Sequence, residues 1–306
     1  LGDFLKREGY GEAFISDHLM PMGAAIWSSS VEQMLGFPTL GFLRFFKNHG
    51  LTQLSNRPEW RTVDGGSREY VKRILADFPG KIHYSDPVQR VDRQPGNVTL
   101  VTASGNQSQH DHVIMACHSD EALRLLGAPT AEEQTTLGSI RYQNNKAVLH
   151  TDTNLMPERK RAWASWNYIG SRVDKDSELL CVTYWMNLLQ SLETPEPLLV
   201  TLNPSRPIDE DKIIERYDYA HPIFDAVAIN AQPDLWKLQG QKNTWFCGAY
   251  FGYGFHEDGI QSGLGVAELL GGVPRPWTVA EEGDRVNFTS HAPSLNKSEE
   301  QQVKAA

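Results

Sequence analysis

Apolar residues recur at helical spacing over residues 1–80. In the first predicted helix, the positions that share one face are Phe14, Ile15, His18, Leu19 and Met22. A second helix is predicted between Pro38 and Gly50, and its inward positions are expected to be Leu40, Leu43 and either Phe45 or Phe46. A third is predicted from Ser67 to Gly80. This part of the chain is therefore expected to be helical.

The period of the pattern changes from helix to strand at residue 81. Short strands are predicted at 82–84, 88–91 and 98–102, with glycine-containing turns between them. An apolar run over 112–117 predicts a buried strand. Ser119 is expected to cap a short helix that ends at Gly127. Thr130 and Glu133 have the spacing of a capping box for the next helix.

Residues 145–202 have the pattern of a mostly antiparallel sheet. Its strands are predicted at 147–151, 161–168, 179–186 and 198–202. Residues 209–240 show a mixed pattern, which indicates a surface-facing segment. A last strand at 245–247 leads into a glycine-rich loop and a helix at 260–270. From 271 onward the chain is polar without periodicity, so a disordered tail is expected.

The stretch 246–263 has the order strand, glycine-rich loop, helix. A helix start carries free backbone N–H groups and a positive dipole end, which suits a phosphate or an electron-rich ring edge. Glycines allow another molecule to approach the backbone closely. The same pattern also fits a tight turn with aromatic packing. His256 beside Glu257 is a candidate acid–base pair, and neighbouring loop residues also often point apart.

This stretch resembles the C-terminal FAD motif of the amine oxidase, phytoene desaturase and protoporphyrinogen oxidase superfamily. In that motif a strand ending in Gly-Asp is followed by a loop, then by Glu-Gly-Ala and a small-residue helix. The residues that match it, and that the resemblance implies as FAD-binding, are Gly248, Ala249, Glu257, Asp258, Gly259 and Ile260. Ala249 stands where the superfamily has an acidic residue that contacts the ribityl chain.

Three further segments resemble the same superfamily in the same order. The stretch 63–67 resembles the Gly-Gly segment that precedes its long helix. The stretch 88–91 resembles its second FAD-domain segment, in which a backbone group at the position of Val88 meets the adenine. The stretch 137–149 resembles the start of its substrate sheet, where amine oxidases carry a flavin-facing lysine. Lys146 stands at that position, and its alternative is a surface lysine at a strand start. The resemblance makes Lys146, Phe255 and His256 the candidate catalytic residues.

Over nearly its whole length the chain also resembles a bacterial NAD/FAD-binding, amine-oxidase-like subgroup. The stretches that carry this likeness are 19–27, 60–63 and 250–259. Members of this subgroup resemble the flavoprotein segment associated with cyclopropane-fatty-acid synthase. The likeness implies lipid acyl chains as candidate substrates, a methyltransferase or cyclopropane-synthase-type partner, and peripheral contact with a membrane.

Composition excludes several other classes of function. The net charge of −9 disfavours nucleic acid as a partner, and no apolar run approaches the length of a membrane span. Three scattered cysteines argue against a disulfide framework and a structural zinc site, so we expect no metal and a cytoplasmic protein. No zinc-protease, serine-hydrolase or phosphate-loop motif occurs. No Gly-x-Gly-x-x-Gly motif occurs either, and the chain begins at Leu1, which indicates a fragment or a processed chain.

The expected fold is mixed α/β (α+β), with a Rossmann-like FAD domain that lacks its first βαβ segment and a substrate domain of antiparallel sheet and helices. The substrate domain is expected to comprise most of 1–80 and the sheet region 128–235. The FAD domain is expected to comprise 81–127 and 236–272, followed by the tail at 273–306. Loop aromatics are expected either to line the flavin and an apolar channel or to pack in the core, and they are Tyr250, Phe251, Tyr253 and Phe255.

These features predict a flavin-dependent oxidoreductase that transfers hydride or electrons between FAD and an apolar substrate, a lipid acyl chain or an amine. The alternative is a non-catalytic lipid- or protein-binding module, left after loss of the nucleotide-binding segment. A Gly-x-Gly-x-x-Gly motif encoded upstream favours the enzyme, whereas a start codon near Leu1 favours the module.

Overall fold

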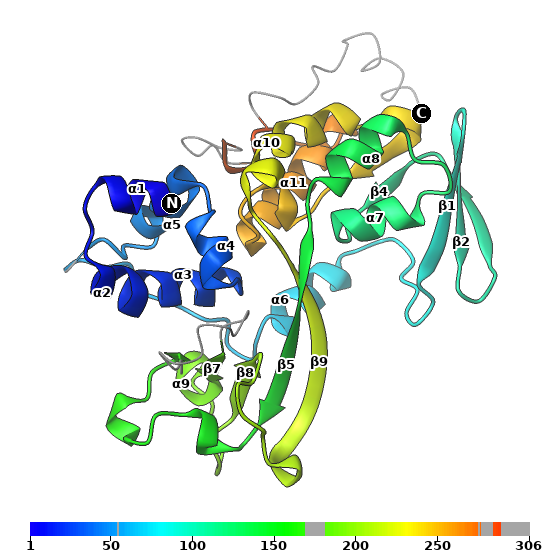
Figure 1. Cartoon of the computed structure of the whole chain (residues 1–306). Helices are drawn as coiled ribbons and strands as arrows, with labels where there is room; N and C mark the ends of the chain where they lie inside the picture. Colours follow the sequence, from blue (N-terminus) through cyan, green and yellow to red (C-terminus); the bar gives the residue numbers. More distant parts are fainter. Residues whose placement is uncertain (54, 169–180, 275, 277–283, 289–306) are drawn as a thin grey trace. The chain divides into compact units, whose positions relative to one another are not determined.

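The computed structural model describes residues 1–53, 55–168, 181–274, 276 and 284–288. The chain divides into two compact units. The first unit comprises Leu1–Lys81 and Gln143–His221, and the second comprises Ile82–Tyr142 and Pro222–Ala306. Each unit is therefore assembled from two separate stretches of the chain (Figure 1).

The N-terminal stretch of the first unit is helical, as predicted. Its elements are α1 (Gly2–Arg7), α2 (Glu12–Phe14), the π-helical turn η1 (Ile15–Leu19), α3 (Met20–Trp27), α4 (Val31–Leu35), α5 (Thr39–Asn48) and α6 (Arg68–Ala76). The inward positions of α5 differ from the prediction, because Leu40 and Leu43 are exposed. The buried stripe is Phe42, Phe45 and Phe46, whose i, i+3, i+4 spacing forms one helical face. Phe14 and His18 are also exposed, while Leu19 and Met20 are buried.

The remainder of the first unit is a five-stranded sheet with the order β6-β7-β8-β5-β9. Its strands are β5 (Tyr142–His150), β6 (Trp166–Tyr168), β7 (Val182–Trp185), β8 (Leu199–Leu202) and β9 (Ile213–Pro222), with α9 (Met186–Gln190) and the 3-10 turns η2 (Thr153–Leu155), η3 (Lys160–Ala162) and η4 (Glu210–Lys212) between them. The β6-β7, β7-β8 and β5-β8 pairs are antiparallel, as predicted. The strand predicted at 161–168 is shorter in the structure, where it is β6, because η3 occupies the start of the predicted range. Strand β9 was not predicted.

The second unit contains a parallel pair of strands, β4 (Val113–Met115) and β10 (Thr244–Phe246). Its helices are α7 (Ser119–Leu125), α8 (Ala131–Gly138), α10 (Ala226–Leu235) and α11 (His256–Leu269), with the 3-10 turns η5 (Trp236–Leu238), η6 (Gln241–Asn243), η7 (Ala249–Phe251) and η8 (Asp284–Val286). Trp236, Phe246 and Phe251 are fully buried in one apolar core. The predicted capping box of Thr130 and Glu133 is present at the start of α8.

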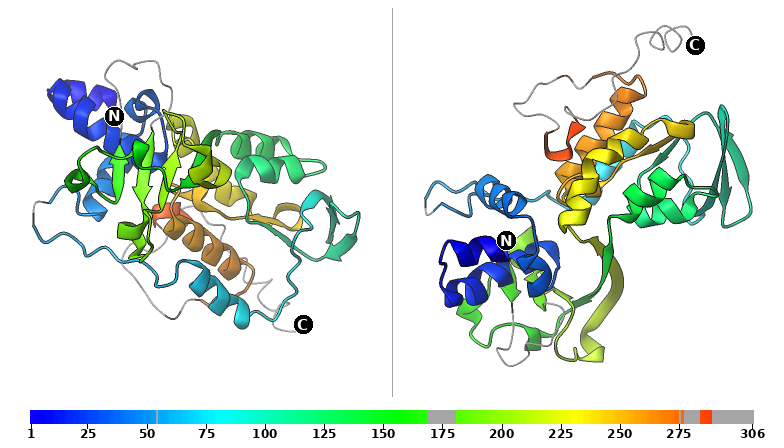
Figure 2. Two further views of the ribbon diagram at one scale, coloured as in Figure 1. Left: turned by 90° about the horizontal axis from the view of Figure 1, so that it is seen from below. Right: turned by 45° about the horizontal axis from the view of Figure 1, so that its top comes forward.

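A three-stranded antiparallel sheet completes the second unit, and it forms the twisted teal ribbon in both views of Figure 2. Its strands are β1 (Val88–Gln94), β2 (Asn97–Thr102) and β3 (Gln107–His110). The predicted strand at 82–84 is wrong, because these residues have no ladder partner, and β3 was not predicted. On β1, Arg93 forms a bidentate ion pair with Glu133, and both side chains are almost fully buried.

Two segments that were predicted to face solvent are part of the second unit's core. The prediction for 209–240 is wrong at α10 and η5, where Leu235 and Trp236 are fully buried. The predicted tail is wrong at 284–288, where Val286 is fully buried, while its residues 277–283 and 289–306 lie outside the described residues. Both helices α8 and α10 belong to the second unit, whereas the sequence placed 128–235 in the substrate domain. The sequence pattern did not predict the burial of these residues, because isolated apolar residues in a polar segment give no periodic signal.

Candidate functional site

The glycine-rich loop starts where the parallel strand pair ends. The N–H of Cys247 donates to the carbonyl of Met115 at 3.1 Å, which extends the ladder one residue past β10. The N–H of Gly248 then leaves the ladder and donates to Ser262 Oγ of α11 at 3.0 Å. The carboxyl end of a parallel pair is the edge at which α/β sheets bind ligands.

A carboxylate from α11 holds the far end of this loop. Asp258 is fully buried, and its Oδ2 accepts the N–H groups of Tyr253 at 3.0 Å and Phe255 at 2.9 Å. Its Oδ1 accepts Arg285 Nε at 2.8 Å. Gly252 is required beside it, because a Cβ there would lie 2.4 Å from Asp258 Oδ1.

A second helix fixes the middle of the loop. Gln232 of α10 is buried, and its amide donates to the carbonyls of Tyr250 and Gly252. Gly254 has φ +89°, and a Cβ on it would lie 2.8 Å from the ring of Phe224. The loop is thus held from α10 and α11 together, so its backbone geometry is formed before any ligand arrives.

The loop leaves several backbone groups available. Within the described residues, no acceptor is recorded for the N–H groups of Ala249, His256 and Glu257. Gly259 opens the space beside them, because a Cβ added there would have only one neighbour within 4 Å, Ala249 N at 3.7 Å. These groups form a cradle of N–H donors at the positive end of α11, suited to an electron-rich ring edge or a phosphate.

Buried polar side chains gather next to this loop in the second unit. The hydroxyls of Tyr250 and Ser119 are buried, and the described residues provide neither with a hydrogen-bond partner. Ser119 N–H donates to the hydroxyl of Tyr142 at 2.9 Å. Burial raises the pKa of Tyr142 to about 12 and that of Cys247 to about 11, so both are neutral near pH 7. The unsatisfied hydroxyls indicate a site that a bound molecule or water completes.

The structure places the predicted cofactor-binding residues within the second unit. Gly248 and Ala249 begin the loop, and 257–260 form the first turn of α11 after Phe255, its N-cap. Val88 begins β1 and packs against the same core. Glu257 accepts Gln261 Nε2 one turn along the helix at 2.7 Å, and the acid–base role of His256 with Glu257 stays a prediction. Tyr250 and Phe251 pack in the core, as one of the two sequence alternatives predicted.

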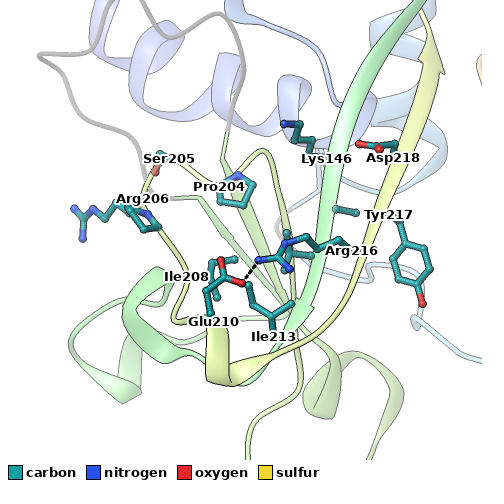
Figure 3. Close-up of a pocket in the computed structure, with 13 residues that line it drawn as sticks. Lys146, Pro204, Ser205, Arg206, Ile208, Glu210, Ile213, Arg216, Tyr217 and Asp218 are labelled. Atoms are coloured by element: carbon teal, nitrogen blue, oxygen red, sulfur yellow. Dashed lines mark hydrogen bonds and ion pairs between the residues drawn. The ribbon is translucent and has the colours of Figure 1, made fainter.

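Lys146 lies in the first unit, exposed on β5. It lines a cavity of about 580 Å³ between β5, β9 and the segment 204–208, in which Glu210 pairs with Arg216 (Figure 3). Buried apolar side chains, Val148 and Ile208, form part of the wall. Within the described part of the chain, the ammonium group of Lys146 has no recorded partner. The predicted flavin-facing role of Lys146 stays a prediction.

The sequence profile of the flavin-containing amine oxidoreductases matches residues 3–270. The chain belongs to this family. No curated protein matches it closely enough to be considered a relative. Family membership confirms the predicted superfamily and its FAD cofactor.

Solved structures with a similar fold share little sequence with this chain. Reduced UDP-galactopyranose mutase has a TM-score of 0.54 at 13% identity, over 94% of this chain and 70% of that one. A protein described as a protoporphyrinogen oxidase from Exiguobacterium sp. 255-15 also has a TM-score of 0.54 at 13% identity, over 86% and 64%. A CLA-producing fatty acid isomerase from P. acnes has a TM-score of 0.42 at 15% identity, over 60% of this chain. The chain spans 47% of the isomerase's length. The likenesses to the mutase and to the Exiguobacterium protein confirm the mixed α/β fold.

The residues present fit a flavin. The cradle at Ala249, His256, Glu257 and Gly259 would be filled by a side chain at position 259, and it presents donors to an electron-rich ring edge. The unsatisfied Tyr250 hydroxyl lies in the same loop. Among the described residues, no group of three His, Cys, Asp or Glu side chains could hold a metal ion. No helix among them is both long and apolar enough to cross a bilayer.

Proposed function

We propose that this chain provides the C-terminal flavin-binding loop and the substrate unit of an FAD-dependent oxidoreductase. The observation that carries the proposal is the preformed loop 247–259, which has free N–H groups at Ala249, His256 and Glu257 and open space beside Gly259. Bound FAD would supply hydride or electron transfer. The chain's own residues orient the group through backbone donors and keep Cys247 and Tyr142 neutral beside it.

The substrate that we propose is apolar, a lipid acyl chain or an amine. The sequence likeness to the subgroup associated with cyclopropane-fatty-acid synthase supports the acyl chain, together with a methyltransferase or cyclopropane-synthase-type partner and peripheral membrane contact in the cytoplasm. Membership of the amine oxidoreductase family supports the amine. Anaerobic reduction of the flavin by acyl lipids or by amines would distinguish these substrates.

The test of the cofactor site is the substitution Gly259→Val in the full-length protein. Its backbone has ordinary helical geometry and open space beside the Cα, so the variant is expected to fold. The β-branched side chain would fill the cradle, and the affinity for flavin is expected to fall at least about tenfold, which corresponds to about 1.4 kcal/mol of binding free energy. The flavin absorbance of the purified protein is expected to fall with it.

The matched control is Gly138→Val at the end of α8, an exposed glycine whose added Cβ would only contact Leu123 at 3.8 Å. It is expected to retain its flavin. Undiminished flavin in a folded Gly259→Val variant would remove this loop from the cofactor site. Absence of flavin from the full-length wild-type protein would contradict the proposed function itself.

A further inference from the structure

A short C-terminal segment, residues 284–288, packs onto the second unit beyond the end of the family match at residue 270. The indole N–H of Trp236 donates to the carbonyl of Val286, whose side chain is fully buried. The ring of Phe288 meets Trp236 edge-to-face with centroids 4.9 Å apart. Gly265 of α11 lies directly below this contact, since a Cβ there would be 2.9 Å from both rings. The segment is thus anchored by the apolar side chains that follow Arg285, Val286 and Phe288.

Arg285 is the residue by which this segment reaches the flavin-binding loop. Its Nε donates to Asp258 Oδ1 at 2.8 Å, and 28% of its side chain is exposed while the Asp258 side chain is fully buried. The other oxygen of Asp258 accepts the N–H groups of Tyr253 and Phe255. One carboxylate therefore connects Arg285 to two loop amides immediately before the free N–H groups of α11.

In this connection Arg285 supports Asp258, and Asp258 in turn holds the loop amides. A buried carboxylate is costly unless a positive group and hydrogen-bond donors surround it. A charged carboxylate accepts backbone N–H groups more strongly than a neutral one. Arg285 therefore compensates the buried carboxylate of Asp258, which accepts the N–H groups of Tyr253 and Phe255. Loss of the guanidinium would leave a buried charge with two backbone donors only.

We infer that Arg285 is a positioning residue of the flavin-binding loop, acting through Asp258 on the backbone of residues 253–255. By this inference, the segment 284–288 contributes to the cofactor site, although it lies outside the stretch that the family profile covers. The effect on the loop is independent of any ligand. The effect on flavin affinity rests on the proposed function.

The inference is tested by hydrogen exchange in the full-length protein and in its Arg285→Met variant. The amides of Tyr253 and Phe255 are expected to exchange at least about tenfold faster in the variant, because their acceptor loses its ion-pair partner. Amides of the β1–β2 ladder, which Arg285 does not touch, report the stability of the whole unit. The matched control is Arg124→Met, which removes an exposed Arg–Asp hydrogen bond of 2.7 Å on α7 and should change these rates less than about twofold.

A double-mutant cycle with Asp258→Asn separates positioning from general packing. If Arg285 acts through Asp258, Arg285→Met should add less than about twofold to the exchange rates in the Asp258→Asn background. Additive effects would overturn the inference, as would equal acceleration of the β1–β2 amides in Arg285→Met. If Asp258→Asn does not fold, the comparison of loop and ladder amides in Arg285→Met decides alone.

Flavin binding gives the second readout. The dissociation constant for FAD, measured by quenching of flavin fluorescence, is expected to rise at least about fivefold in Arg285→Met and to stay within about twofold in Arg124→Met. Unchanged affinity together with unchanged loop exchange would overturn the inference. If the full-length wild-type protein binds no FAD, the proposed function fails, while the exchange rates still decide the role of Arg285.

Discussion

The contribution of a single side chain depends on what surrounds it, as Asp258 and Lys146 show. Asp258 was predicted to contact the cofactor, yet both of its oxygens are occupied by donors of this chain. Its contribution to the site is the shape of the loop. Lys146 has the opposite environment, because it is exposed and the described residues give its ammonium group no partner. The ammonium group of such a lysine can bind a ligand, or it can be solvated by water only.

Lys146→Met distinguishes these two roles. If Lys146 faces the flavin, as in the amine oxidases that the sequence resembles, the variant should keep its flavin. It should slow flavin oxidation at least about tenfold more than flavin reduction, because in those amine oxidases the lysine holds a water near flavin N5 that could relay a proton or oxygen when the reduced ring is re-oxidised. If Lys146 is solvated, both half-reactions should change less than about twofold, as for the exposed control Lys47→Met. Stopped-flow absorbance of the two half-reactions provides the measurement, and equal small effects would end the hypothesis.

At the scale of the element, a buried polar chain crosses three strands of the first unit's sheet. His150 on β5 lies 2.7 Å from Thr201 Oγ1 on β8, which lies 2.8 Å from Thr183 Oγ1 on β7. The N–H of Asp152 donates to His150 Nδ1 at 3.1 Å, which places the imidazole proton on Nε2. This arrangement needs a neutral ring. Burial lowers the pKa of His150 from its ordinary value of 6.5, although the Asp152 carboxylate nearby opposes the shift.

The stability of the sheet should therefore depend on pH. Because the folded-state pKa of His150 is depressed, the unfolded chain takes up the proton first as pH falls. Stability is full above about pH 6.5 and declines from there towards the lower folded-state pKa. Between pH 7.5 and 5 the wild type should lose about 1 kcal/mol more unfolding free energy than His150→Gln, by urea unfolding at each pH. His83→Gln, at an exposed histidine, should keep the wild-type slope, and identical slopes in all three proteins would contradict the assignment.

At the scale of the whole molecule, each unit combines two distant stretches of sequence. Strand β5 begins at Tyr142 in the second unit and continues into the first, and β9 returns to Pro222 in the second. The second unit holds the candidate flavin loop, and the first holds the antiparallel sheet. Within residues 1–306 no Gly-x-Gly-x-x-Gly motif occurs, so neither unit contains the loop that usually cradles the pyrophosphate of a dinucleotide.

Residues 1–306 expressed alone are therefore expected to purify with little flavin, well below one FAD per chain. The loop 247–259 supplies donors for one part of the cofactor, whereas the pyrophosphate contacts account for a large share of the binding free energy. The ratio of flavin absorbance to protein absorbance measures the occupancy. The full-length protein is the comparison and is expected to be yellow. Stoichiometric, tightly held FAD on residues 1–306 would show that other residues of this chain bind the pyrophosphate.

The sequence by itself determined the features whose signal is local. Helical spacing, strand runs and the capping box of Thr130 and Glu133 depend on residues a few positions apart, and the structure contains them. The order strand, glycine-rich loop, helix over 244–269 is local as well, and it carried the resemblance that the family profile confirms. The family of the chain was therefore readable before the fold.

Only the tertiary structure decided which face each residue turns and which distant residues meet. Gln232 and Arg285 hold the loop from 18 to 27 positions away, the largest separation being that of Arg285 and Asp258. The short, mixed-polarity segments that contain them give no periodic pattern. Burial of Trp236 and Val286 depends on packing against each other's elements, which the one-dimensional pattern does not encode. The sequence named the cofactor loop, and the packing of distant segments fixed its shape.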